Sequence, residues 1–91
     1  MPVTHAPDRH RFVVATPHGE AELAYRLRPD GAMDLLHTFV PEAARGGTLA
    51  SDLVSAAVAY ARTHGLKLVA TCPYVQSWLK RHQEAGELFV K

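Results

Sequence analysis

One stretch of this sequence constrains the fold more than any other, because residues 33–71 combine two apolar segments, a glycine-containing loop and an alanine-rich segment. Residues 33–40 are apolar on both sides, which predicts a central strand covered on both faces. A helix is predicted to begin at Leu49 and to end at Gly65, since apolar residues recur at helical spacing and alanine favours the helix. Residues 67–71 are typical of a short strand. This strand–helix–strand run predicts a right-handed crossover between parallel neighbours.

Upstream of this stretch the sequence predicts two more strands. Residues 11–16 are rich in phenylalanine and valine, and residues 21–28 alternate apolar with polar side chains, as a half-exposed strand does. Residues 17–20 and the Pro-Asp-Gly run at 29–31 have the residue types of turns. The three strands should therefore form an antiparallel meander, preceded by a flexible tail over residues 1–9.

Downstream, a second helix is predicted from Pro73, whose missing N–H costs nothing at the first helical position. Gly86 should break this helix, and residues 88–90 are typical of a last short strand or an extended tail. The predicted order is β-β-β-α-β-α, an α+β fold with an α/β-type core. Its mixed sheet runs from the antiparallel meander into one parallel β-α-β unit. We predict a single domain over residues 10–91, because a chain of 91 residues builds one small core.

Composition excludes several classes of protein. A net charge of +1 does not supply the surplus of lysine and arginine that a nucleic-acid partner needs. A single cysteine, Cys72, cannot form an intrachain disulfide. Residues 1–9 lack the apolar centre of a signal peptide, and no apolar run approaches the roughly 20 residues that span a bilayer. We therefore predict a cytoplasmic protein without a membrane or nucleic-acid partner, either a monomer or a weak dimer.

The first candidate site is the run Arg45-Gly46-Gly47-Thr48-Leu49-Ala50, which follows the central strand and opens the helix. A helix N-terminus presents free N–H groups and a positive dipole, and the two glycines allow close approach, so this run suits a pyrophosphate. The Arg45 side chain could add a charged contact. Neither the P-loop pattern nor the three-glycine dinucleotide pattern is present. The alternative is a loop that only starts a helix.

Two further residues could carry chemistry. Cys72 stands between a predicted strand and a predicted helix start, where a thiolate is favoured, although a free cysteine also packs as a small apolar side chain. His37 lies on the strand that leads to the glycine loop, and it could be a base or a hydrogen-bonded core residue. The other histidines have no metal-ligand spacing with each other or with Cys72, so no metal site is predicted.

Together, residues 36–41, 45–50 and 72–75 resemble a small group of single-domain acetyltransferases of the GNAT superfamily, over residues 10–82 of this chain. The resemblance implies a trimmed GNAT fold that lacks much of the N-terminal substrate-binding region. It also implies acetyl-coenzyme A as cosubstrate, with its pyrophosphate at the 45–50 loop and its pantetheine arm along the backbone at Val40. Cys72 matches a cysteine near the expected thioester, and His37 matches the histidine of a His-Thr motif.

One position departs from the family's phosphate pattern, Gln/Arg-x-x-Gly-x-Gly/Ala. Thr48 stands where the pattern has its first glycine, and its Cβ narrows the allowed backbone, while its hydroxyl could donate to a phosphate oxygen. Asp52, in the first helical turn, would repel a pyrophosphate.

Two functions therefore stay open. The chain could transfer acetyl to an amine of a small molecule or a protein lysine. In that case the amine attacks the thioester directly, with His37 or a water removing the proton, or Cys72 takes the acetyl group first. Alternatively, the chain is a non-catalytic module that binds coenzyme A or a protein partner.

Overall fold

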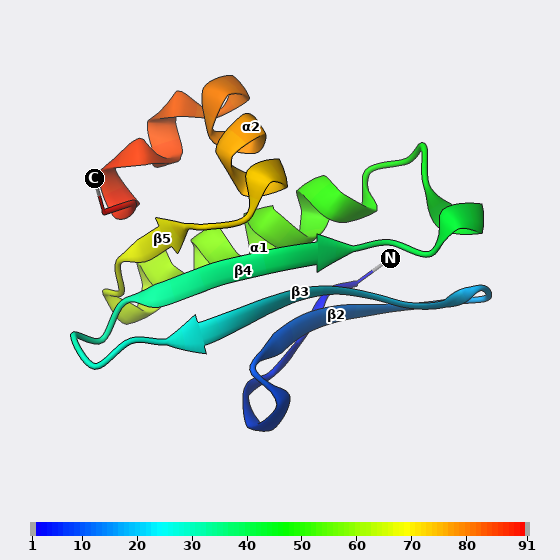
Figure 1. Cartoon of the computed structure of the whole chain (residues 1–91), viewed down its shortest axis with the longest axis horizontal. Helices are drawn as coiled ribbons and strands as arrows, with labels where there is room; N and C mark the ends of the chain where they lie inside the picture. Colours follow the sequence, from blue (N-terminus) through cyan, green and yellow to red (C-terminus); the bar gives the residue numbers. More distant parts are fainter. Residues whose placement is uncertain (1, 91) are drawn as a thin grey trace.

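The structure, a computed structural model, describes residues 2–90 and is built around a mixed five-stranded sheet whose strands lie side by side in chain order (Figure 1). The first four strands pair antiparallel, and the fourth and fifth pair parallel. This confirms the predicted meander that leads into one parallel unit. The strands are β1 (Thr4–Ala6), β2 (Arg11–Thr16), β3 (Gly19–Leu27), β4 (Met33–Phe39) and β5 (Leu68–Ala70).

Two α-helices and three short 3-10 helices complete the fold. The long helix α1 (Leu49–His64) connects β4 to β5 and packs on one side of the sheet against β2 and β3 (Figure 1). It ends at Gly65, whose φ of 66° is left-handed, so the predicted C-terminal glycine is confirmed. Helix α2 (Pro73–Arg81) begins at the predicted proline. The 3-10 helices are η1 (Pro7–Arg9), η2 (Glu42–Ala44) and η3 (Gln83–Leu88).

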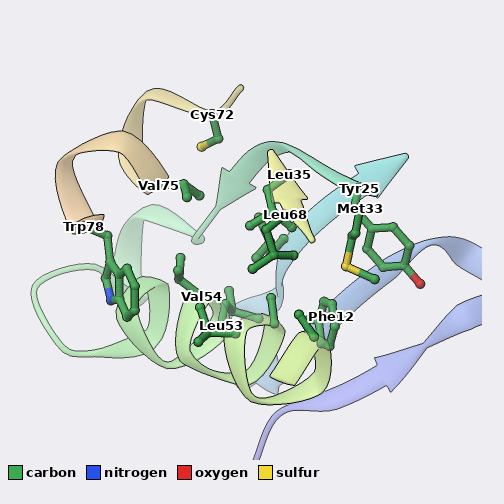
Figure 2. Close-up of a cluster of buried hydrophobic side chains, with 14 of the residues drawn as sticks. Phe12, Tyr25, Met33, Leu35, Leu53, Val54, Leu68, Cys72, Val75 and Trp78 are labelled. Carbon is green, nitrogen blue, oxygen red and sulfur yellow. The ribbon is translucent and has the colours of Figure 1, made fainter. Parts of the chain in front are cut away.

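The core is a single hydrophobic cluster between the sheet, α1 and α2 (Figure 2). Leu53 and Val54 of α1 are fully buried in it, together with Leu35 of β4. Trp78 of α2 packs beside α1, and its indole N–H donates a hydrogen bond of 3.1 Å to Ser51 Oγ. This cluster fixes α1 and α2 relative to the end of β4. No helix within residues 2–90 is both long enough and apolar enough to cross a membrane.

Two predictions of local structure are wrong. Thr4–Ala6 pairs with β2 instead of lying in a loose tail, while Met1 and Lys91 fall outside the described residues. Gly86 does not end α2, because α2 already ends at Arg81 and Gly86 lies inside η3. Of the two forms predicted for residues 88–90, the structure favours the extended tail, since Phe89 is extended and forms a single bridge with Leu68.

The prediction that β4 is covered on both faces is also wrong. His37 and Phe39 are exposed on the face of the sheet that is turned away from α1. Polar side chains of β3, such as Glu22, accompany them there. One face of an antiparallel sheet is commonly left to solvent in this way.

An aromatic cluster holds β1 against the rest of the molecule. The ring of His5 stacks on Phe12 with centroids 4.4 Å apart and meets Tyr60 of α1 edge-on at 4.4 Å. Its Nε2 lies 2.6 Å from the Tyr25 hydroxyl. Burial lowers the pKa of His5 below its usual value, and the nearby His64 lowers it further. The cluster therefore favours a neutral His5.

We expect the protein to lose stability as pH falls, partly through His5. In the unfolded chain this imidazole takes a proton near pH 6.5, whereas the folded protein resists that proton. The stability that the neutral His5 contributes is therefore fully present above about pH 6.5, and it is lost as pH falls below that value. Urea unfolding at pH 7.5 and pH 5.5 should show a smaller loss for His5→Gln than for the wild type. An equal loss in both proteins, with His18→Gln as a surface control, would contradict this role.

Candidate functional site

The two parallel strands separate at their carboxyl ends. Register between β4 and β5 runs from Met33 opposite Leu68 to Leu35 opposite Ala70. The N–H of Cys72 then donates to the carbonyl of Leu35 at 2.9 Å, and the chain turns into α2. Within the described pairings, β4 continues to Phe39 with no β5 residue opposite it. The edge of β4 that faces β5 therefore has free backbone groups beyond Leu35.

A β-bulge in β4 decides which side chains face this opening. Tyr25 of β3 is opposite Leu35, but the preceding residue Ala24 is opposite His37, so Leu36 is the extra residue. Beyond the bulge, Thr38 lies opposite the buried Leu23 and thus on the side of the sheet that α1 covers. His37 consequently points to the opposite, open face.

A groove starts at this opening and runs to the N-terminus of α1. One cavity, of about 270 Å³, is lined by Thr38, Phe39, Val40, Arg45, Ala50 and Tyr74. A second, of about 90 Å³, is lined by Val40, Ala44, Arg45, Gly46, Gly47, Leu49 and Ala50. Val40, Arg45 and Ala50 line both cavities, so the two cavities adjoin and together form the groove. The structure therefore brings the residues predicted for the pyrophosphate loop together with the backbone at Val40, except for Thr48, which lines neither cavity.

The loop beside the second cavity leaves backbone N–H groups free at the start of α1. The first hydrogen bond there joins Asp52 N–H to Thr48 O at 2.8 Å, so the preceding amides are not used by the helix. Gly46 has a φ of 95°, a conformation that other residues rarely adopt. The Nε of Arg45 donates to the Val40 carbonyl at 2.9 Å, which ties the loop to the end of β4, and Arg45 is exposed.

The departure at Thr48 has a structural consequence. The Thr48 hydroxyl donates to Asp52 Oδ2 at 3.0 Å. The hydroxyl proton that the sequence suggested for a phosphate oxygen is therefore already bound by Asp52. Asp52 also places a carboxylate beside the helix N-terminus. A negative charge there stabilises the helix but opposes a bound anion.

Cys72 lies where the sequence predicts it, at the residue preceding α2. Its side chain is only 3% exposed and belongs to the hydrophobic core. Its sulfur lies 3.5 Å from the Thr38 hydroxyl, which lines the groove. The Cys72 side chain therefore does not line the groove itself, but it contacts Thr38, which does.

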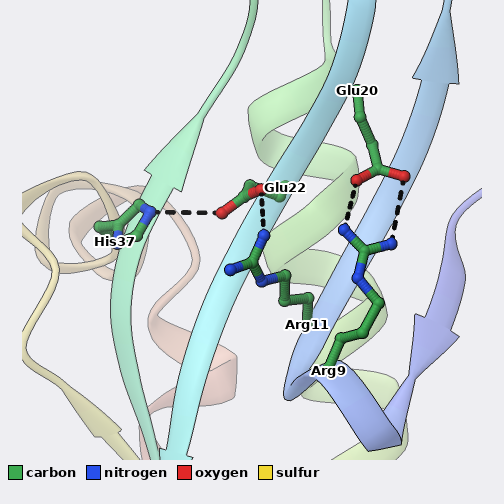
Figure 3. A network of polar contacts seen from close by, with 5 residues as sticks. All are labelled: Arg9, Arg11, Glu20, Glu22 and His37. Atoms are coloured by element: carbon green, nitrogen blue, oxygen red, sulfur yellow. Dashed lines mark hydrogen bonds and ion pairs between the residues drawn. The ribbon is translucent and has the colours of Figure 1, made fainter.

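His37 is not a core residue, because its side chain is 60% exposed. Its Nε2 lies 3.4 Å from Glu22 Oε2 on the open face (Figure 3). His37 and Cys72 are thus on opposite faces of β4, and the structure does not bring them together.

Five residues of this region are absent from the predicted site. Thr38, Phe39, Ala44 and Tyr74 line the groove, and Glu22 contacts His37. The four groove residues are detectable in principle, since each adjoins or nearly adjoins a residue already singled out. Nothing in the sequence marks Glu22, because its placement beside His37 depends on the register between β3 and β4.

Comparison with known proteins gives three findings. Residues 11–88 match the model of the GCN5-related N-acetyltransferase family. Protein NATD1 of Danio rerio and that of Homo sapiens are each 35% identical to the chain over 82 residues, which cover 88% of this chain and 74% and 73% of those proteins. A GCN5-like putative N-acetyltransferase from Staphylococcus aureus, solved by NMR, superposes with a TM-score of 0.73 at 21% identity. That match covers 98% of this chain and 87% of the other, so the fold is shared almost throughout.

Proposed function

This chain belongs to the GCN5-related N-acetyltransferase family, and from that membership we propose that it transfers acetyl from acetyl-coenzyme A to an amine. The observation that carries the proposal is the pair of adjoining cavities that reaches from the free edge of β4 to the N-terminus of α1. A groove of this form suits a ligand with a polar chain at one end and a pyrophosphate at the other.

Each part of the groove has a role in holding acetyl-coenzyme A. The amides at the start of α1 and the backbone at Gly46 and Gly47 bind the pyrophosphate, with the Arg45 guanidinium as a charged contact. The free backbone groups of β4 beyond Leu35 pair with the amides of the pantetheine arm up to Val40, whose carbonyl is bound by Arg45, as an added strand pairs with a sheet edge. The acetyl thioester then lies at the opening between β4 and β5, beside Thr38.

The reaction at this opening is direct transfer. The amine nitrogen forms a bond to the thioester carbonyl carbon, and the bond from that carbon to sulfur breaks. His37 takes the proton that the amine loses, directly or through one water. Tyr74 lines the groove, and in this mechanism its hydroxyl gives a proton to the departing thiolate and regains one from solvent. The burial of Cys72 behind Thr38 supports this mechanism over an acetyl-cysteine intermediate.

We expect Cys72→Ser to keep at least about half of the wild-type kcat, because direct transfer makes no bond to this sulfur. Serine is close to cysteine in volume and keeps the contact with Thr38. Initial rates of coenzyme thiol release at saturating acetyl-coenzyme A measure the effect. A loss of about a thousandfold with unchanged coenzyme affinity would instead assign the first acetyl acceptor to Cys72.

One observation favours a second candidate function, a non-catalytic module that binds coenzyme A or a protein partner. The Thr48–Asp52 contact places a carboxylate beside the proposed pyrophosphate site. If the Asp52 carboxylate repels the pyrophosphate more strongly than the helix dipole attracts it, the chain has the fold of the family without acetyl transfer.

An acceptor panel separates the two candidates. Purified protein is incubated with acetyl-coenzyme A and spermidine, lysine methyl ester or a lysine-containing peptide, and thiol release and acetylated product are both measured. The enzyme hypothesis expects saturable transfer to at least one acceptor above the uncatalysed rate. Binding of acetyl-coenzyme A without transfer to any acceptor supports the non-catalytic module.

A further inference from the structure

Glu22 lies at the centre of a charged network on the open face of the sheet (Figure 3). Its Oε1 accepts a hydrogen bond of 2.9 Å from Arg11 Nη1, and its Oε2 lies 3.4 Å from His37 Nε2. The Glu22 side chain is 16% exposed, whereas those of Arg11 and His37 are 38% and 60% exposed. Each of the two carboxylate oxygens therefore has a partner among the described residues.

The contact with Glu22 determines which nitrogen of His37 can act as a base. An ionised carboxylate can only accept hydrogen bonds, so its charge favours a proton on the nitrogen that faces it. In the neutral imidazole that proton occupies Nε2, and the lone pair is left on Nδ1. Arg11 holds the other oxygen of Glu22 and thus limits rotation of the carboxylate.

His37 lies close along the chain to a residue that lines the groove. His37 follows the bulge at Leu36 and precedes Thr38, which lines the groove at the opening between the strands. Phe39, which lies on the same face of the sheet as His37, lines the first cavity, so the open face borders the groove beside the imidazole. Another charged pair, Arg26 with Asp34 at 3.8 Å, lies farther along the same face.

We propose that Glu22 is a positioning residue, which holds His37 so that Nδ1 accepts the proton of the attacking amine. The inference rests on the proposed acetyl transfer. As the bond from nitrogen to the acetyl carbon forms, the amine proton moves to Nδ1, and the resulting imidazolium pairs with the Glu22 carboxylate. The exposed ring then returns the proton to solvent, so the step needs no other reactant.

The neighbouring pair Arg9–Glu20 offers a matched control. Glu20 lies on the same strand and the same face as Glu22 and accepts from Arg9 Nη2 at 2.8 Å, but it has no histidine contact among the described residues (Figure 3). Glu20→Gln and Glu22→Gln therefore each remove one carboxylate that pairs with an arginine. Only Glu22→Gln removes the carboxylate beside His37.

Steady-state kinetics with the best acceptor of the panel test the proposal. For Glu22→Gln we expect kcat to fall about tenfold or more while KM for acetyl-coenzyme A stays within about twofold. Glu20→Gln should match the wild type. His37→Ala should lose at least as much kcat as Glu22→Gln, and the double variant Glu22→Gln/His37→Ala should be no slower than His37→Ala. Additive losses, or equal effects of the two glutamine variants, would overturn the positioning role.

A second readout does not depend on turnover. Imidazole nitrogen NMR shifts at pH 8 should show His37 as the Nε2–H form in the wild type and in Glu20→Gln, with more Nδ1–H form in Glu22→Gln. A wild-type ring that carries its proton on Nδ1 would overturn the inference even if the enzyme is active. Absence of transfer to every acceptor, despite the expected NMR result, would instead reject the proposed function and the catalytic use of His37 with it.

Discussion

Replacing Ala50 with aspartate is expected to weaken acetyl-coenzyme A binding by about 30-fold or more. The new carboxylate repels the pyrophosphate, and this repulsion costs roughly 2 kcal/mol of binding free energy. Ala50 lines both cavities of the groove and is the second residue of α1. An acidic residue in the first turn stabilises a helix, so the substitution should leave the fold intact. The loss should therefore appear in ligand affinity and not in stability.

Isothermal titration with acetyl-coenzyme A measures this effect. The control is Ser55→Asp, which adds the same charge at an exposed position farther along α1 and outside the groove. Its affinity should stay within about twofold of the wild type, because charge effects of the helix dipole fall off beyond the first turn. If Ala50→Asp binds as tightly as Ser55→Asp, the pyrophosphate does not lie at the N-terminus of α1.

The second large effect concerns stability. Leu53→Ala is expected to lower the free energy of unfolding by about 3 kcal/mol, within the range of about 2–5 kcal/mol for such truncations. Leu53 is 0% exposed and lies on α1 within the single core cluster. Since small domains are stable by only about 5–15 kcal/mol, this change removes a large share of the total.

Urea unfolding followed by circular dichroism gives the value. Leu27→Ala removes the same atoms from a side chain that is 50% exposed, and its cost should stay below about 1 kcal/mol. Equal midpoints for Leu53→Ala and Leu27→Ala would show that α1 does not pack on the sheet as described.

The elements that the sequence predicts well are those with a strong local signal. The helical spacing of apolar residues before Gly65 matches α1, and the prolines and glycines bound the strands of the meander. β1 has no such signal, because it is three residues long and contains polar residues. Its strand form depends on pairing with β2 and on the contacts of His5 with Phe12 and Tyr60.

The candidate site divides in the same way. The Arg45–Ala50 loop is predictable, since a strand, glycines and a helix start follow each other in the chain. The surroundings of His37 are not, because simple alternation from the buried Leu35 would turn His37 inward as well. The bulge at Leu36 reverses this, so that His37 faces Glu22 and Thr38 faces Cys72. Such a bulge arises from pairing between β3 and β4, which the local sequence of β4 does not determine.

The central claim is that acetyl-coenzyme A binds along the groove between β4 and the start of α1. Amide NMR spectra recorded during titration of the wild-type protein with acetyl-coenzyme A test it most directly. We predict saturable shifts that are largest at residues 38–40, 45–47, 49–50 and 74, which line the groove. Absence of saturable shifts at millimolar ligand, or shifts centred on the separate cavity beside Trp78 and His82, would contradict the claim.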